Sequence, residues 1–233
     1  MSGHTQTALQ LQPVQAQPAN ARKPLPPSVA GLNLLENLGV SIVVRRDQEI
    51  YGQDDPAEYY YQVISGSVRT VKLMADGRRQ VSEFLLPGEV FGFDALDRYD
   101  FAAEALEDAL VRRYPRRRVE ALAGQDAALS QRLRQLMNAK LRQAHDRMLV
   151  LGRMTASERI ASFLLQLADR AAGPIELAMS RRDIADYLGL TIETVSRTLT
   201  MLKADGTIRM FKKCRLEIRN RAALEAMASE RRH

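Results

Sequence analysis

The chain has little material for metal, redox or membrane chemistry. Its 233 residues include one cysteine, Cys214, and three histidines. A single thiol excludes a disulfide within the chain and a zinc or iron–sulfur site built from several of its own thiolates. No apolar run approaches the roughly 18–20 residues that span a bilayer, and no basic start followed by an apolar stretch marks a secretion signal. We therefore expect a cytoplasmic protein with no metal site and no membrane segment.

The motifs of common enzymes are also missing. The sequence shows no nucleophile–base pair, no paired carboxylates with a supporting motif and no glycine-rich phosphate loop. A chain that binds a partner without transforming it needs none of these groups. We therefore predict no catalytic residues and no enzymatic activity.

Positive charge is concentrated in the second half of the chain. Residues 28–115 hold nine basic and fifteen acidic residues, a net charge of −6, whereas residues 116–177 and 178–221 each carry +5. This asymmetry favours an anionic partner such as nucleic acid for the C-terminal half. A solvated surface with chance clustering would explain the same charges, so composition alone does not decide between them.

The first half contains a polar tail followed by short strand-like runs. Residues 1–28 are rich in Gln, Pro and Ala and bury too little apolar surface to fold, so we predict a disordered tail. A short helix around Gly31–Leu38 is expected to follow it. Up to Tyr114, runs of β-branched and aromatic residues alternate with turns, and Asp76-Gly77 is a hairpin signal. Residues 29–115 therefore predict a small antiparallel sandwich or jelly roll.

A long amphipathic helix is predicted within residues 116–153, because apolar residues recur there mostly at spacings of three and four. This stripe packs either on the chain's own sandwich or on the same helix of a second subunit. Lys140 and Gln143 interrupt it, so it is not a strong heptad pattern. We predict a homodimer through seven residues of this helix: Leu129, Leu133, Leu136, Met137, Ala144, Met148 and Leu151.

Residues 154–233 carry the signals of a helix-turn-helix. Thr155 and Glu158 form a capping box that starts one helix, and Ser180 and Asp183 form a second. Gly189 follows as a turn residue, and Thr191 then caps a helix that runs to about Lys203. Two short helices joined by a glycine turn, the second with polar residues near its start, are typical of a helix-turn-helix.

A two-stranded wing is predicted after these helices, with a basic tip at Lys212 and Lys213. The simpler interpretation is an ordinary helical hairpin with a solvated face, in which Glu193 and Arg197 form only an i,i+4 pair. The coincidence of small, turn, buried and basic residues favours DNA binding. We expect base contacts from Glu193, Ser196 and Arg197, and DNA-backbone contacts from Arg182, Thr191, Thr194, Lys203, Lys212 and Lys213.

Three segments together resemble the CRP–FNR superfamily of bacterial transcription regulators: ISGSVR at 64–69, LPGEVFG at 86–92 and GLTIETVSRTL at 189–199. The resemblance implies an α+β chain: an N-terminal antiparallel β-roll (29–115), a dimerisation helix (116–153) and a C-terminal winged helix-turn-helix (154–233). The E-x-x-S-R pattern at 193–197 is similar to the FixK-type members of the FNR branch, which read TTGA–TCAA inverted repeats in double-stranded DNA. The resemblance to these FixK-type members further implies an activator that works with RNA polymerase in low-oxygen metabolism or nitrogen fixation.

The sequence departs from the cofactor-binding members of that superfamily. Gly88-Glu89 are present, but the stretch 99–106 reads YDFAAEAL and lacks the arginine–hydroxyl pair that holds a cyclic phosphate. The chain has no cysteine near the N-terminus to bind an iron–sulfur cluster, and no histidine between residues 5 and 144 to serve as an axial haem ligand. We therefore expect no bound cofactor and interpret Gly88-Glu89 as a structural turn. A sensor that binds another small effector in the β-roll is the alternative.

Cys214 lies in the predicted wing beside Lys212, Lys213 and Arg215. Neighbouring cations favour the thiolate, which would make this cysteine oxidisable. A small residue in a strand with no redox role is the simpler interpretation, and we favour it.

Overall fold

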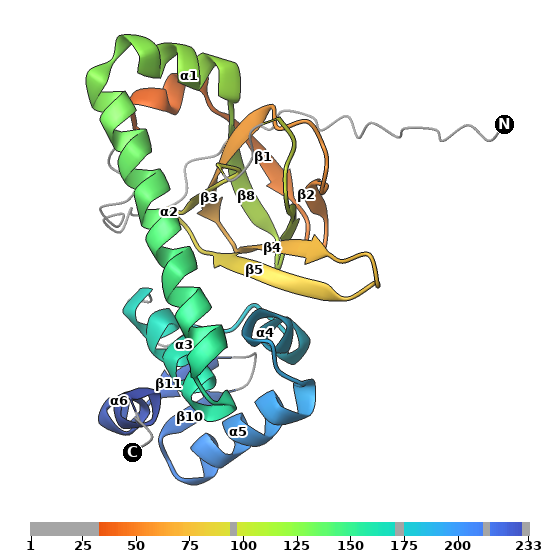
Figure 1. Ribbon diagram of the computed structural model, residues 1–233, viewed down its shortest axis with the longest axis vertical. Coiled ribbons are helices and arrows are strands. Elements are labelled where there is room, and N and C mark those ends of the chain that lie inside the picture. Colours follow the sequence, from red (N-terminus) through yellow and green to blue (C-terminus); the bar gives the residue numbers. More distant parts are fainter. Residues whose placement is uncertain (1–32, 94–96, 171–174, 212–214, 230–233) are drawn as a thin grey trace, which may run out of the picture. The chain divides into compact units, whose positions relative to one another are not determined.

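The computed structural model describes residues 33–93, 97–170, 175–211 and 215–229 (Figure 1). The chain divides into two compact units. Unit 1 contains the described residues up to Val68 together with Leu85–Arg132, and unit 2 contains Arg69–Phe84 and the described residues from Leu133 onward. The predicted tail, 1–28, lies outside the described residues. In the ranges described, no helix combines the length and apolar character needed to cross a membrane.

The predicted antiparallel β-roll is confirmed. A 3₁₀ helix, Asn33–Leu38, precedes it, with Leu35 buried. One sheet has the strand order β1-β8-β3-β6 and the other β2-β7-β4-β5. The strands are β1 (Val40–Val44), β2 (Glu49–Tyr51), β3 (Tyr59–Ser65), β4 (Val68–Leu73), β5 (Arg79–Leu85), β6 (Val90–Phe91), β7 (Ala102–Ala105) and β8 (Ala109–Pro115).

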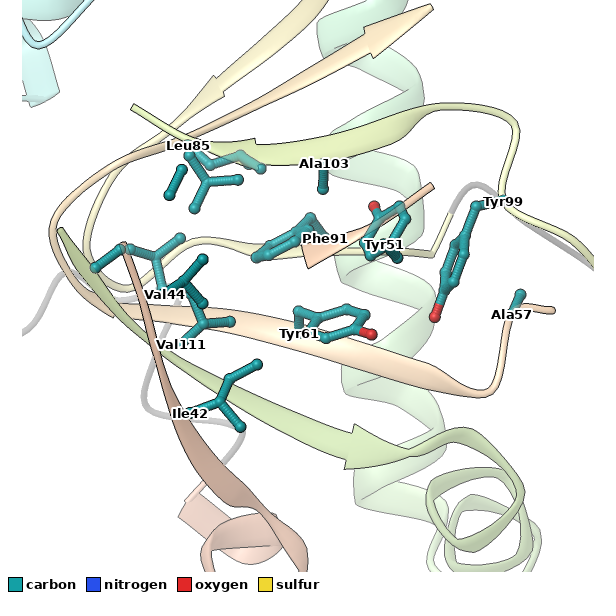
Figure 2. Packing of buried hydrophobic residues seen from close by; sticks show 14 residues of the cluster. Ile42, Val44, Tyr51, Ala57, Tyr61, Leu85, Phe91, Tyr99, Ala103 and Val111 are labelled. Carbon is teal, nitrogen blue, oxygen red and sulfur yellow. The ribbon is translucent and has the colours of Figure 1, made fainter. Parts of the chain in front are cut away.

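Stacked aromatic rings fill the core of unit 1 (Figure 2). The ring centroids of Tyr51 and Tyr99 lie 3.8 Å apart, and those of Tyr61 and Phe91 lie 5.2 Å apart. The Tyr99 hydroxyl donates to the carbonyl of Tyr59 at 2.7 Å and accepts from its N–H at 3.1 Å. Because a buried phenol needs a polar partner, this pair of hydrogen bonds lets Tyr99 sit fully inside the roll.

Two glycine turns connect neighbouring strands in left-handed backbone conformations, but their surroundings differ. Gly66, between β3 and β4, has φ +78°, and a Cβ there would lie 2.6 Å from the carbonyl oxygen of Asp108. Gly77, in the β4–β5 hairpin, has φ +81° with nothing within 4 Å of such a Cβ. The hairpin predicted at Asp76-Gly77 is confirmed, since Gly77 N–H donates to the carbonyl of Met74 at 2.9 Å.

These two turns make a matched stability test. Gly77→Ala should cost about 1–2 kcal/mol, the strain of a left-handed alanine. Gly66→Ala should cost clearly more, because it adds a clash with backbone to the same strain. Urea unfolding of both variants measures the difference, and equal losses would contradict the close packing around Gly66.

The long helix predicted within residues 116–153 is α2 (Ala127–Arg153), and a separate helix, α1 (Arg116–Gln125), precedes it. Asp126 separates the two helices with extended backbone, φ −117° and ψ 107°. Its carboxylate accepts hydrogen bonds from the N–H groups of Ala128 and Leu129, at 2.8 and 3.1 Å. An aspartate that caps a new helix satisfies its free N–H groups, so the chain ends one helix and starts another there.

Unit 2 contains the remaining helices and a small sheet. The capping box at Thr155 and Glu158 is confirmed by their reciprocal hydrogen bonds. The wing strands belong to a three-stranded sheet of order β10-β11-β9, so the prediction of two strands missed β9. A terminal helix, α6, was not predicted either. The elements are α3 (Ala156–Arg170), β9 (Ile175–Glu176), α4 (Arg181–Leu188), α5 (Ile192–Ala204), β10 (Ile208–Phe211), β11 (Arg215–Ile218) and α6 (Arg221–Ser229).

Candidate nucleic-acid interface

Helix α4 and the turn after it form as the sequence predicts. The Ser180 hydroxyl accepts from the N–H of Asp183 at 3.1 Å, while the Asp183 carboxylate accepts from the N–H of Ser180 at 2.8 Å. This reciprocal pair is a capping box. The helix ends at Gly189, whose φ of +62° is left-handed, and Leu190 N–H then closes the turn onto the carbonyl of Ala185. The chain therefore turns sharply into α5.

Helix α5 starts at its own cap and packs one face into unit 2. Thr191 accepts a hydrogen bond from the N–H of Thr194 at 3.2 Å. Val195, Leu199 and Leu202 are buried, with exposed fractions of 2% or less. Their spacings of four and three put them on one side of the helix. The packing of this side leaves the opposite face of α5 open.

The three predicted base-contacting residues lie on that open face. Glu193 and Arg197 are exposed, and Ser196 between them is half-buried. Within the described part of the chain, neither Glu193 nor Arg197 has a hydrogen-bond or ion-pair partner, so they do not form the i,i+4 pair of the simpler interpretation. Two unpaired side chains of opposite charge, one turn apart near a helix start, are available for donor and acceptor contacts to base edges.

The residues predicted to contact the DNA backbone have different surroundings. Arg182 and Lys203 are exposed, at the start of α4 and the end of α5. Thr191 and Thr194 are partly engaged in capping, with their hydroxyl oxygens 2.9 Å apart. Lys212 and Lys213, like Cys214, lie outside the described residues.

A basic recess beside the wing adds two residues that the sequence analysis missed. Lys203, Arg209 and Arg219 line it together with residues of β10. The Arg209 guanidinium lies over the Phe211 ring, 4.7 Å from its centroid, and Arg219 forms an ion pair with Glu217 at 3.1 Å. The sequence does contain a signal for Arg209. It follows the buried Ile208, and because side chains alternate along a strand, its own side chain is expected to be exposed.

The apolar stripe of α2 divides into two faces. Of the seven predicted dimer contacts, Leu129 is buried within its own chain, and Leu133, Leu136 and Leu151 are half-buried. Met137, Ala144 and Met148 are exposed. Leu141, exposed at 55%, was missed and belongs with them. Spacings of four, three and four from Met137 through Leu141 and Ala144 to Met148 are those of a coiled-coil seam.

The glycine turn of the β-roll supports its structural interpretation. The Glu89 carboxylate accepts from the N–H of Leu86 at 2.8 Å, and the N–H of Gly88 donates to the carbonyl of Val63 at 2.8 Å. Across the stretch 99–106, Tyr99 is buried in the aromatic core, and Ala102, Ala103 and Ala105 are buried in β7. In this arrangement Glu89 acts on its own turn, and the alanines present no charge or side-chain donor to an anionic ligand.

Two family models match the chain. Residues 41–126 match the cyclic nucleotide-binding domain, and residues 158–227 match the Crp-like helix-turn-helix domain. The combination defines a DNA-binding regulator with a nucleotide-sensor-like domain. The chain belongs to the CRP–FNR family of transcription regulators, as the resemblance indicated.

Its curated relatives include FixK proteins. The nitrogen fixation regulation protein FixK of Azorhizobium caulinodans is 48% identical over 199 residues, which cover 82% of this chain and 80% of that protein. FixK of Rhizobium meliloti is 42% identical over 184 residues, covering 78% and 84%. The solved structure of FixK2 from Bradyrhizobium japonicum has a TM-score of 0.80 and 45% identity, and covers 83% of this chain and 99% of that one. These relatives are transcription regulators, and the chain is accordingly a DNA-binding regulator and not an enzyme.

Proposed function

We propose that the protein regulates transcription, mostly as an activator, by binding a TTGA–TCAA inverted repeat as a homodimer. The observation that carries this proposal is the open face of α5, where Glu193 and Arg197 are exposed and unpaired among the described residues. A recognition helix enters the major groove with residues of its first turns. Both side chains lie there.

The base assignments follow from hydrogen-bond chemistry. Arginine donates two hydrogen bonds to O6 and N7 of guanine, and a carboxylate accepts from N4 of cytosine. The G·C pair within each TTGA half-site offers both edges. We therefore assign Arg197 to guanine, Glu193 to cytosine and Ser196 to a neighbouring base or phosphate. Contacts from Arg182 and Lys203, and from Lys212 and Lys213 on the wing, would go to phosphates, which set affinity rather than sequence.

Dimerisation would use the exposed seam of α2, defined above as Met137, Leu141, Ala144 and Met148. A contiguous apolar seam on a long helix is a typical pairing surface. Two helix-turn-helix units can then reach successive major grooves, about 34 Å apart on one face of the duplex. Three of the residues predicted from the sequence, Met137, Ala144 and Met148, would therefore form the centre of the dimer interface.

RNA polymerase is the further partner expected of an activator, and the cytoplasm is where such a protein meets its promoters. The relatives named nitrogen fixation regulation protein support a role in nitrogen fixation, and a transcriptional activator protein of Pseudomonas aeruginosa at 36% identity supports activation. The link to low-oxygen metabolism is what the FixK-type resemblance implies. These roles rest on similarity rather than on any single residue of the chain.

We expect the purified protein, free of metal and nucleotide, to bind its inverted repeat specifically in air. The reasons are the missing cluster cysteines, the hydrogen bond that Glu89 accepts within its own turn, and the buried alanines at 102, 103 and 105. Fluorescence-anisotropy titrations with and without cyclic AMP, haem or anaerobic iron measure this. A requirement for any of them would support the alternative, a sensor that binds an effector in the β-roll.

A further inference from the structure

A buried carboxylate connects the first helix of the helix-turn-helix to the β4–β5 hairpin. Asp183, only 3% exposed, already caps α4. Its Oδ1 also accepts hydrogen bonds from Arg69 on β4 at 3.0 Å and from Arg79 on β5 at 2.7 Å. A buried charge is tolerated only when it is paired and hydrogen-bonded, and two guanidinium groups meet that need. The hairpin is therefore tied to α4 through this residue.

A second carboxylate extends the same connection. Arg79 also donates from Nε and a terminal nitrogen to Asp186 on α4, at 3.1 and 2.9 Å. The side-chain amide of Gln80 donates to the backbone carbonyl of Asp186. Because two donors of Arg79 meet the same Asp186 oxygen, Oδ2, and its terminal nitrogen also reaches Asp183, these bonds restrict rotation of α4 against the hairpin.

Helix α2 joins the hairpin and α4 at the same place. Arg147 on α2 donates to the backbone carbonyls of Val81 on β5 and Tyr187 on α4, the latter at 2.8 Å. Its guanidinium also lies 4.0 Å from the centre of the Tyr187 ring. Two turns earlier on α2, Lys140 forms an ion pair with Glu83 of β5 at 2.6 Å. Arg147, on the proposed dimerisation helix, thus contacts both β5 and α4.

Aromatic packing surrounds these polar contacts. The ring of Phe84 on β5 lies 5.0 Å from Tyr187 on α4 and 6.0 Å from Phe163 on α3, between ring centroids. Arg170 of α3 donates to the carbonyl of Phe84 at 2.8 Å. Such packing adds apolar contacts between β5, α3 and α4 beside the ion pairs.

The charges of Asp183 and Arg79 persist at neutral pH. Burial alone would raise the pKa of Asp183, but its hydrogen bonds with Ser180 and the nearby Arg69 and Arg79 hold that pKa below its usual value. Burial likewise opposes the charge of Arg79, yet its bonds to Asp186 and Asp183 raise its pKa. A carboxyl whose folded pKa is depressed contributes stability above its unfolded pKa and loses it as the pH falls further. Asp183 and Arg79 are therefore ionised throughout the neutral range.

We propose that these contacts form a rigid joint between α2, the β4–β5 hairpin and α4, and that this joint sets the half-site spacing that the dimer accepts. The joint consists of Arg69, Arg79, Arg147, Asp183 and Asp186. Arg79 and Arg147 are its positioning residues, which act through α4. This inference rests on the proposed function, since spacing matters only for a dimer on an inverted repeat.

The physical reason lies in the geometry of the duplex. Adding one base pair between the half-sites increases their separation by about 3.4 Å and rotates one half-site by about 35° relative to the other. A rigid joint cannot follow that change without breaking contacts, so the wild-type protein should prefer one spacer length. A loosened joint samples many orientations, and affinity falls by the fraction of dimers that are competent to bind.

The test uses the full-length protein and three kinds of DNA: inverted repeats whose spacer varies by one base pair, a single half-site, and unrelated sequence. The variants are Arg79→Gln, Arg147→Gln and Asp186→Asn. Arg78→Gln is the matched control, because Arg78 is the neighbouring arginine of the same hairpin and its ion pair is with the exposed Asp76 at 2.7 Å. It removes the same charge without touching the joint.

We expect Arg79→Gln and Arg147→Gln to weaken binding to the preferred repeat about tenfold, and to bring the affinities for all spacers close together. Half-site affinity should stay within twofold of wild type, and Arg78→Gln should keep the wild-type spacer preference. Combining Arg79→Gln with Asp186→Asn should cost less than the sum of the two, because they share one contact.

Two results would overturn the joint: an unchanged spacer preference in both arginine variants, or an equal loss on half-site and repeat, which would mean a phosphate contact or a damaged fold. Circular dichroism and thermal melting identify a damaged fold, and in that case the Asp186→Asn spacer series decides the matter. If the wild-type protein itself binds repeat and half-site equally, the proposed function fails instead of the joint.

Discussion

Arg197→Ala should abolish the preference for guanine in each half-site and weaken binding by about 1–3 kcal/mol per half-site. For a symmetric dimer this amounts to about 2–6 kcal/mol, at least a thirtyfold loss of affinity. The reason is that Arg197 is exposed and unpaired among the described residues, so its donors would all be available for the two acceptors of guanine. Titrations against every single-base variant of the inverted repeat measure both effects.

Lys203→Ala is the control for this prediction. Lys203 is also exposed, but it lines the basic recess at the end of α5, away from the first turns. Its loss should weaken all sequences alike and reduce the slope of affinity against salt concentration. The same uniform loss for Arg197→Ala would mean that Arg197 contacts phosphate and that its assignment to guanine is mistaken.

Ala144→Glu should convert the dimer into monomers and reduce affinity for the full inverted repeat to that for a half-site. Ala144 is the smallest residue of the exposed seam on α2, and a symmetric interface would bury two introduced carboxylates side by side. Burying each unpaired charge costs several kcal/mol. Loss of the second binding unit removes an avidity gain of about 10²–10⁴. Light scattering and DNA titration measure the two consequences.

Ala139→Glu makes the same substitution on another face. Ala139 is also exposed on α2, but it lies five residues from Ala144 and therefore about 140° around the helix. Its variant should remain dimeric with unchanged affinity. If both variants dissociate, added charge on α2 is responsible rather than the seam, and if neither does, the dimer uses another surface.

The elements that carry the candidate site could be predicted because their determinants are local. The capping boxes at Thr155 and Ser180 involve groups three residues apart, and the turn at Gly189 depends on the backbone of one residue. The buried face of α5 follows from a periodicity of three and four. Interactions of this range leave a mark in a short stretch of sequence, so the helix-turn-helix and its open face were predicted correctly.

Other features depended on choices between comparable local patterns. The break at Asp126 was missed because an aspartate is compatible with a helix interior at small cost and becomes a cap only when its side chain turns to the following N–H groups. For a related reason, the sequence does not separate the buried and the exposed residues of the predicted dimer stripe. Leu129 and Leu141 are equally apolar in sequence, and only the packing of the chain buries one and exposes the other.

By itself the sequence determined the order of the main elements and the caps and turns that bound them, and it predicts base contacts from residues at the start of α5. Only the tertiary structure decided which side of α2 stays open and which charges meet across the hairpin and α4. Asp183 pairs with Arg69 and Arg79 at sequence separations of 114 and 104 residues. Contacts of that range arise from the packing of whole elements against each other, and no pattern within either segment specifies them.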